Sequence, residues 1–460
     1  MSSQVFASGA QLVYLILVSR LLKPQDFALF AVAGVLTTLG NTLVLTSIGR
    51  SAARRQDDDL TGDRSLLTAS LILGLTVTLI VVASAYPIAA LWRLPEATKL
   101  TLLLSLQIPL ISMIGVQAGI LRRLGKIKLY AQVQIVSSIF GVVVGIFACV
   151  LIRSSSSLAY QPLATAAIAV LIPIFKLGQR ALPGKLTVHS SQDLRFGIRS
   201  GLSGMAVFLP YLFPQWAIST VLGPTVLANW NRATLVGQVP IDLTNKSLAT
   251  VVYPYFRHHK NSDSRVSHLW TRMLCACSLI VFPSLGLVLS LVPSVVTFLL
   301  GNSWLLAAQM APWLVAYALV TLQASLLGNA LESSSNFKSL WVGQLMAAGV
   351  LIATSMLVWP LHSWIPVGVA LVTSAILSHT IQLAMAAQAN LVNVKNVAIC
   401  YSMALAISSC LFCVVQVILW ATLTPVATCV LIAACGLSYL FVLYRARERL
   451  HIPPTTWSQP

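Results

Sequence analysis

Polar and charged side chains gather in one stretch of an otherwise apolar chain. It reads L-A-N-W-N-R-A-T-L-V-G-Q-V-P-I-D-L-T-N-K-S-L from residue 227. On a helix, at 100° per residue, six of its polar side chains fall within an arc of roughly 140°. They are Asn231, Arg232, Gln238, Asp242, Asn245 and Lys246. Charges in apolar surroundings are costly unless paired or hydrated, so this face predicts contact with water or with another polar helix.

The charges on this face suit an anionic ligand. Asp242 and Lys246 are four residues apart in the favourable order and are predicted to pair. Arg232 lies about 15 Å from Asp242 by helical rise, so it has no partner in its own helix. Arginine binds phosphate through fork-like hydrogen bonds, and Pro240 should kink the helix and expose carbonyls. The alternative is a structural Asp242–Lys246 pair with Arg232 extended towards solvent.

Weaker candidates lie elsewhere. Arg20, near the end of the first apolar segment, either extends to solvent or helps to bind an anionic headgroup. Asp26, just after Pro24, is predicted to be a helix N-cap. His362 and His379 either couple protons near neutral pH or serve as ordinary packing residues.

No enzyme motif accompanies these residues. The chain lacks GxxxxGK[ST], HExxH and GxSxG patterns. Cys410 and Cys413 form a C-L-F-C pattern with no histidine nearby, and we interpret them as small packing residues. We therefore expect a protein that is not an enzyme, with no catalytic residue, no metal site and no cofactor.

Composition defines the class of protein. Of 460 residues, 57% are hydrophobic and 9% are charged, whereas soluble domains carry about 25% charged residues. Apolar blocks of roughly 18–28 residues can each cross about 30 Å of hydrocarbon as a helix. This excludes a soluble enzyme, a secreted disulfide scaffold and a disordered chain. An all-α polytopic membrane protein is predicted, with about fourteen spans: 5–22, 27–48, 66–87, 100–121, 129–152, 159–176, 202–222, 225–251, 273–299, 305–330, 340–360, 364–387, 397–421 and 425–444.

Charge sets the predicted topology. The chain carries 29 Lys and Arg against 11 Asp and Glu. With both termini in the cytoplasm, basic residues on the inside outnumber those outside by about four to one, as the positive-inside rule requires. We expect a multi-pass protein of the bacterial inner membrane and no nucleic-acid partner. Trp304, Trp313 and Trp364 flank outer boundaries and are interpreted as an aromatic belt.

An internal repeat predicts the domains. A shift of 200 residues aligns residues 21–30 with 221–230, and both copies place a proline before an even-numbered span. Parallel repeats of this kind are typical of alternating-access transporters. The predicted domains are a six-helix bundle, a cytoplasmic linker, a second six-helix bundle, and two additional helices with a cytoplasmic tail. Their boundaries are 1–176, 177–200, 201–390 and 391–460.

Three segments carry a family resemblance. S-R-L-L-K-P-Q-D-F-A-L-F-A-V-A (19–33), L-G-P-T-V-L-A-N-W-N-R-A (222–233) with its continuation over 239–256, and F-L-L-G-N-S-W-L-L-A-A (298–308) resemble signatures of polysaccharide and O-antigen flippases. The resemblance implies the multidrug/oligosaccharidyl-lipid/polysaccharide exporter fold, with two six-helix bundles in a V around a central cavity. It also implies that a polyprenyl-pyrophosphate-linked oligosaccharide moves from the inner to the outer leaflet for surface polysaccharide assembly.

The leading hypothesis is thus a flippase of lipid-linked oligosaccharide. Arg232 with Lys246 would hold the pyrophosphate, while Asn231, Gln238 and Asn245 would bind sugar hydroxyls. Expected partners are this substrate, membrane lipids and, in the cell, a polysaccharide polymerase and other assembly proteins. The main alternative is an ion-coupled multidrug exporter of the same fold. It would favour an acidic cavity, whereas Asp242 is read as the only clearly buried acid; a non-transporting scaffold is a third option.

Overall fold

Every regular element in the described part of the chain is a helix. The computed structural model describes residues 2–54, 59–186, 209–237, 263–333, 337–421 and 439. Within these residues, ten helices are long and apolar enough to cross a membrane, and two shorter apolar helices lie at Gly9–Leu21 and Leu212–Leu222. The all-helical class is confirmed there. The count of fourteen spans stays a prediction, because 202–208, 238–251 and most of 425–444 lie outside the described residues.

The chain forms two compact units. The first comprises Met1–Asn231, Leu299–Trp304 and Val358–Trp364, and the second comprises Arg232–Phe298, Leu305–Leu357 and Ile365–Pro460. Two short segments from late in the sequence thus belong to the first unit. The predicted domain boundaries at 177–200 and 391 stay predictions.

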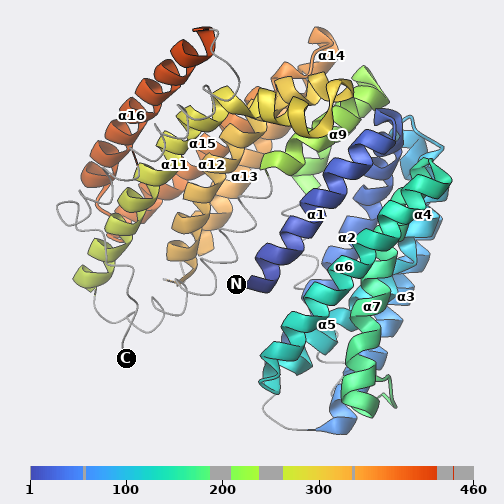
Figure 1. Ribbon diagram of the computed structural model, residues 1–460. Helices are drawn as coiled ribbons and strands as arrows, with labels where there is room; N and C mark the ends of the chain where they lie inside the picture. The colour runs from blue at the N-terminus through green and yellow to red at the C-terminus, as the bar shows by residue number, and fades with distance from the viewer. Residues whose placement is uncertain are drawn as a thin grey trace. The chain divides into compact units, whose positions relative to one another are not determined.

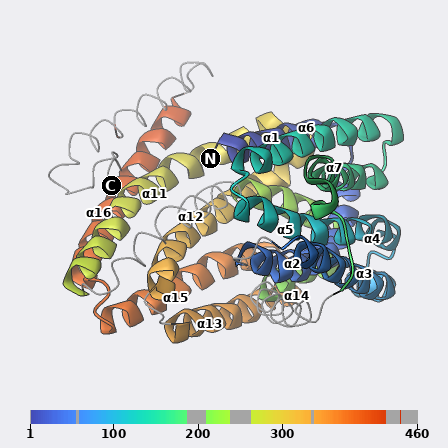
Figure 2. The same cartoon turned by 90° about the horizontal axis from the view of Figure 1, so that it is seen from below.

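The first unit is a bundle whose long helices are labelled in Figure 1. Its helices are α1 (Ser2–Leu21), α2 (Pro24–Arg54), α3 (Leu60–Leu91), α4 (Ala97–Ser105), α5 (Gln107–Arg123), α6 (Ile127–Ile152), α7 (Tyr160–Leu177), α9 (Leu212–Leu222) and α14 (Val358–Leu361). Short 3₁₀ turns are η1 (Ser155–Ala159), η2 (Gly178–Ala181), η3 (Leu209–Tyr211) and η4 (Asn302–Trp304). Helix α2 packs on α3 and α5, and α6 packs between α1 and α7, as Figures 1 and 2 both show.

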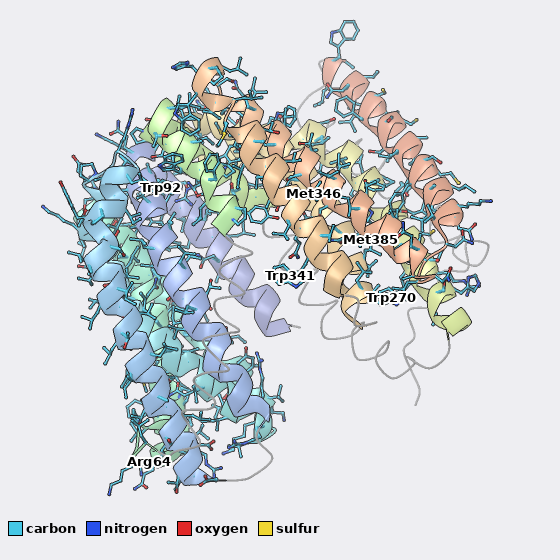
Figure 3. All side chains as sticks on the ribbon, turned by 180° about the vertical axis from the view of Figure 1, so that it is seen from behind. Arg64, Trp92, Trp270, Trp341, Met346 and Met385 are labelled. Atoms are coloured by element: carbon cyan, nitrogen blue, oxygen red, sulfur yellow. The ribbon has the colours of Figure 1, made fainter. Side chains whose placement is uncertain are left out.

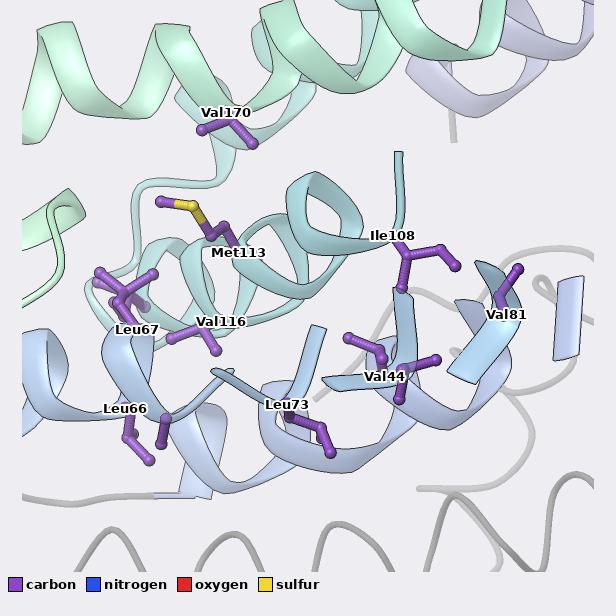
Figure 4. Packing of buried hydrophobic residues seen from close by; sticks show 12 residues of the cluster. Val44, Leu66, Leu67, Leu73, Val81, Ile108, Met113, Val116 and Val170 are labelled. Atoms are coloured by element: carbon purple, nitrogen blue, oxygen red, sulfur yellow. The ribbon is translucent and has the colours of Figure 1, made fainter. Parts of the chain in front are cut away.

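Apolar packing and small residues hold this bundle together. Leu66, Leu67, Ile108 and Val116, each fully buried, form the centre of a cluster shared by α2, α3, α5 and α7 (Figure 4). On α6, Gly145 faces both neighbours: a Cβ there would lie 2.5 Å from Cβ of Gln161 and 2.7 Å from the Tyr14 ring. Close approach through small residues is a common way for membrane helices to pack.

Helix starts follow from local side-chain chemistry. Asp59 caps α3, because its carboxylate accepts hydrogen bonds from the backbone N–H groups of Thr61 and Gly62. The prediction that Asp26 is the N-cap of its helix is wrong. Helix α2 begins at Pro24, so Asp26 lies inside the first turn, and its carboxylate accepts a hydrogen bond from the backbone N–H of Lys23.

The second unit contains five long helices in its described part. They are α11 (Asp263–Leu300, whose last two residues belong to the first unit), α12 (Leu305–Ser333), α15 (Ile365–Gln388) and α16 (Val394–Trp420), with α13 (Phe337–Ser355) packed on α15. Helix α12 also packs on α15. Trp270 and Leu274 of α11 are fully buried in a cluster with Leu326, Leu327 and Val397. Tyr439 adds a hydrogen bond from its hydroxyl to the carbonyl of Leu279.

Candidate functional site

The polar face predicted from the sequence begins in a helix over 224–237. Gly223 has φ of 87° and ends α9, and Pro224 then opens the next helix, where its missing N–H costs nothing. Asn231 and Arg232 lie on this helix. The other predicted site residues, Gln238, Asp242, Asn245 and Lys246, lie outside the described residues. The Asp242–Lys246 pair and the kink at Pro240 therefore stay predictions.

Arg232 is buried. Its exposed fraction is 9%, and the neighbouring Trp230 and Ala233 are 2% and 0% exposed. The guanidinium therefore points into protein rather than to a lipid or solvent surface. Because a buried arginine keeps its charge, this side chain places a positive charge inside the protein.

The amides beside Arg232 bond within their own helix. Asn231 is half-buried, and its Nδ2 donates to the carbonyl of Leu227 at 3.0 Å. Asn229 is buried, and its Nδ2 donates to the carbonyl of Thr225 at 2.8 Å. These bonds fix the amide orientation and leave Oδ1 of Asn231 as an acceptor. At Gly237 a Cβ would lie 2.7 Å from the carbonyl oxygen of Leu314, so the end of this helix approaches the α12 backbone closely.

Two of the resemblance segments meet within the first unit. Nε of Arg20 donates to the carbonyl of Leu299 at 3.0 Å, and the indole N–H of Trp304 donates to the carbonyl of Ser19 at 2.9 Å. The rings of Phe27 and Trp304 pack edge-to-face with centroids 5.3 Å apart. Segment 299–304 is thereby fixed to the junction of α1 and α2. Trp304 is 0% exposed, so its assignment to an aromatic belt is wrong.

A second junction lies at the end of α3 that carries Trp92, opposite the end that carries Arg64 (Figure 3). The Ser219 hydroxyl donates to the carbonyl of Trp92 at 2.8 Å, and the Trp216 indole donates to that of Leu91 at 3.1 Å. Arg93 has φ of 56° and donates to the carbonyl of Thr220 at 3.0 Å. Both junctions thus use side-chain donors to hold backbone carbonyls, which gives each turn one defined geometry.

At the Arg64 end of α3, a buried acid lies among cations. Asp63 is 0% exposed, and its Oδ2 lies 2.6 Å from Arg123 and 3.5 Å from Nε of Arg180. The interpretation of Asp242 as the only clearly buried acid is therefore wrong. Asp63 lies just before the predicted span 66–87, and its partners lie on α5 and η2, far along the chain.

His379 belongs to a buried polar network in the second unit. Gln323 uses both protons of Nε2, which donates to the Tyr401 hydroxyl at 2.9 Å and to the carbonyl of Leu274 at 2.8 Å. The imidazole Nε2 lies 3.0 Å from that hydroxyl, and the two rings stack. These contacts fit the packing interpretation of His379. His362 is exposed at the end of α14, with φ of 46°.

Comparison with known proteins decides the family. The family model described as polysaccharide biosynthesis protein matches residues 17–309, more than half of the chain. The chain belongs to this polysaccharide biosynthesis protein family. Its match includes both junctions of the first unit and the helix that carries Arg232.

Relatives of this family member are transporters. The succinoglycan biosynthesis transport protein ExoT of Rhizobium meliloti is 23% identical over 300 residues, which cover 64% of this chain and 60% of the relative. The chain thus matches less than two thirds of that protein. Among solved structures, the lipid II flippase MurJ in an inward closed conformation aligns with a TM-score of 0.75, 14% identity, and coverage of 96% of this chain and 98% of that one.

A transporter of the MATE family and MOP superfamily, in an inward-facing conformation, aligns with a TM-score of 0.63 and 17% identity, over 83% of this chain and 95% of that one. At these identities the solved structures establish the fold. The chain is therefore a multi-pass membrane protein with the fold of these two structures, and its family links it to polysaccharide biosynthesis.

Proposed function

We propose that this family member flips a polyprenyl-pyrophosphate-linked oligosaccharide from the inner to the outer leaflet of the bacterial cytoplasmic membrane by alternating access. Family membership supports a polysaccharide precursor as the cargo. In this proposal fourteen spans form two six-helix bundles in a V around a central cavity, with two further C-terminal helices. Both termini lie in the cytoplasm, as the distribution of basic residues predicts.

The burial of Arg232 carries the proposal. A guanidinium inside a membrane protein offers several paired donors, and their geometry matches phosphate oxygens. Arg232 is assigned the pyrophosphate, together with Lys246. Asp242, four residues before Lys246 in the sequence, would pair with this lysine when no substrate is bound.

The remaining candidates are assigned to the sugars and to positioning. Asn231, Gln238 and Asn245 would bind sugar hydroxyls, and Oδ1 of Asn231 is oriented for this by the bond from its Nδ2 to Leu227. Arg20 would approach the headgroup from the end of α1, where it also holds the carbonyl of Leu299. The lipid tail would remain in the bilayer, and a polymerase and other assembly proteins would receive the product.

The test is complementation of a deletion strain with charge variants. Arg232→Ala should abolish surface polysaccharide while folded protein remains in the membrane. Arg232→Lys should restore part of the polymer, because lysine keeps the positive charge but lacks the paired N–H donors of the guanidinium. Lys99→Ala, which removes an exposed cation on α4, is the matched control and should leave the polymer at wild-type levels. Unchanged polymer in Arg232→Ala would exclude this role for Arg232.

The alternative is an ion-coupled exporter of small molecules, favoured by the fold shared with the MATE transporter. It predicts that deletion sensitises cells to cationic dyes. The flippase proposal predicts loss of polysaccharide with unchanged dye susceptibility. Asp63 does not favour the exporter, because two arginines already compensate its charge.

A further inference from the structure

An open cavity of about 900 Å³ lies in the second unit, at the start of α11, the end of α15 and the start of α16. The described residues that line it include no acid. They are Ser267, His268, Thr271, Ala387, Asn390, Val392, Asn393, Val394, Lys395 and Asn396. Hydroxyl, amide, imidazole and ammonium groups thus converge on one hollow. In the proposed topology it lies at the cytoplasmic end of these helices.

The cavity has a rigid floor. Trp270, labelled at the end of α11 in Figure 3, is 1% exposed and packs in one cluster with Val392 and Val397. The turn between α15 and α16 is fixed by Asn390, whose φ is 54°, and by a hydrogen bond from the backbone N–H of Asn393 to the Thr271 hydroxyl at 2.9 Å. The polar rim therefore stands on a packed apolar core.

Some of the polar groups have structural roles and others do not. The Asn393 side chain caps α16 by accepting from the backbone N–H of Asn396, and Thr271 donates to the carbonyl of Ser267. Among the described residues, the side chains of His268, Lys395 and Asn396 make no hydrogen bond or ion pair. Two helices thus present unengaged donors, a lysine side chain among them, to the same cavity.

An apolar stripe continues from this rim along α16. Ile399 and Met403 follow Lys395 at four and eight residues, so all three share one helix face. Ile399 is 59% exposed and Met403 is 50% exposed. Exposed apolar side chains continue along α16 beyond Met403 as far as Val417, which is 65% exposed, so the stripe is long enough to lie beside an acyl chain in one leaflet of about 15 Å.

We propose that this cavity binds the headgroup of an anionic phospholipid of the inner leaflet, with an acyl chain along Ile399 and Met403. The donors match a phosphate and its glycerol hydroxyls, and the lysine among the described lining residues fits a negative charge. Basic pockets between membrane helices on the cytoplasmic side bind such lipids by the same chemistry. This proposal does not depend on the transported cargo.

The test is native mass spectrometry of the full-length protein, titrated with phosphatidylglycerol or with phosphatidylcholine. Phosphatidylglycerol should bind more tightly, and Lys395→Ala should weaken its binding about tenfold, as loss of a charged hydrogen bond predicts. Asn396→Ala, which changes no charge, should weaken it about threefold to fivefold. Lys128→Ala is the matched control, since Lys128 is also an exposed lysine at the second position of a long helix, α6.

Each outcome decides the proposal. Selective loss in Lys395→Ala and Asn396→Ala, with unchanged binding in Lys128→Ala, supports a built site. Equal losses in both lysine variants would show diffuse surface attraction and overturn it. Equal binding of phosphatidylcholine would overturn the anionic headgroup. Displacement of phosphatidylglycerol by an equimolar polyprenyl phosphate would overturn the phospholipid assignment and give the cavity to the carrier lipid.

Discussion

The buried ion pair at the start of α3 gives the sharpest stability prediction. Asp63→Asn keeps the shape of the side chain and removes its charge. Arg123, 2.6 Å away and only 10% exposed, would then remain buried without a counter-charge, beside Arg180. Breaking a buried pair from one side costs about 3–5 kcal/mol, because the remaining ion cannot recover its hydration.

The cost should largely disappear when both charges are removed. Asp63→Asn combined with Arg123→Met replaces the pair by neutral groups, a change that is often close to neutral in stability. For a unit of this size, about 3–5 kcal/mol corresponds to a fall of roughly 6–20 °C in the thermal midpoint. The double variant should recover most of that fall.

The assay is thermal unfolding of the purified full-length protein in detergent, followed by tryptophan fluorescence. Glu96→Gln is the matched control, because Glu96 is an exposed acid at the start of α4 whose side chain makes no capping bond. Its midpoint should equal that of the wild type. If Asp63→Asn behaves like Glu96→Gln, or if the double variant is no more stable than the single one, the ion pair does not hold α3, α5 and η2 together.

Other contacts yield shorter predictions. Trp304→Phe should lower the thermal midpoint by the equivalent of about 1–3 kcal/mol, since Ser19 loses its donor; a midpoint equal to wild type would refute the anchoring role of this indole. Gly145→Ala should destabilise the packing of α6 by about 1–3 kcal/mol, because the added methyl overlaps Gln161 and Tyr14, whereas Gly9→Ala, with open space at Cβ, should not. A cysteine placed at Asn231 in a cysteine-free background should react with water-soluble maleimide, and lipid-linked substrate should slow the reaction; complete protection on both sides would remove the hydrated path to Arg232.

The spans were the most predictable part of the structure. Long apolar blocks can be satisfied only as helices in a bilayer, and ten helices of the described chain confirm this. Interruptions were less predictable. The span expected over 100–121 is broken at Leu106 into α4 and α5. Pro109, which has no N–H, cannot bond back to the carbonyl of Ser105 at this point.

Long-range partners were not predictable from one sequence. Arg232 could be singled out from the sequence, because a charged residue within an apolar block is costly unless it is paired or hydrated. Asp63 was missed, since an acid near a helix end is usually solvated and its arginines lie on other elements. Trp304 was assigned to the membrane–water interface because nothing near it in the sequence indicates its distant partner. In the structure its indole N–H donates to the carbonyl of Ser19.

Transbilayer movement in reconstituted vesicles tests the central claim most directly. A fluorescent polyprenyl-pyrophosphate oligosaccharide is placed in one leaflet, and its appearance in the other is followed by loss of protection from a membrane-impermeant quencher. Wild-type protein and Lys99→Ala should accelerate the movement equally, and Arg232→Ala should match protein-free vesicles. Movement in wild-type vesicles no faster than in protein-free ones, or equal rates for wild type and Arg232→Ala, would contradict the account.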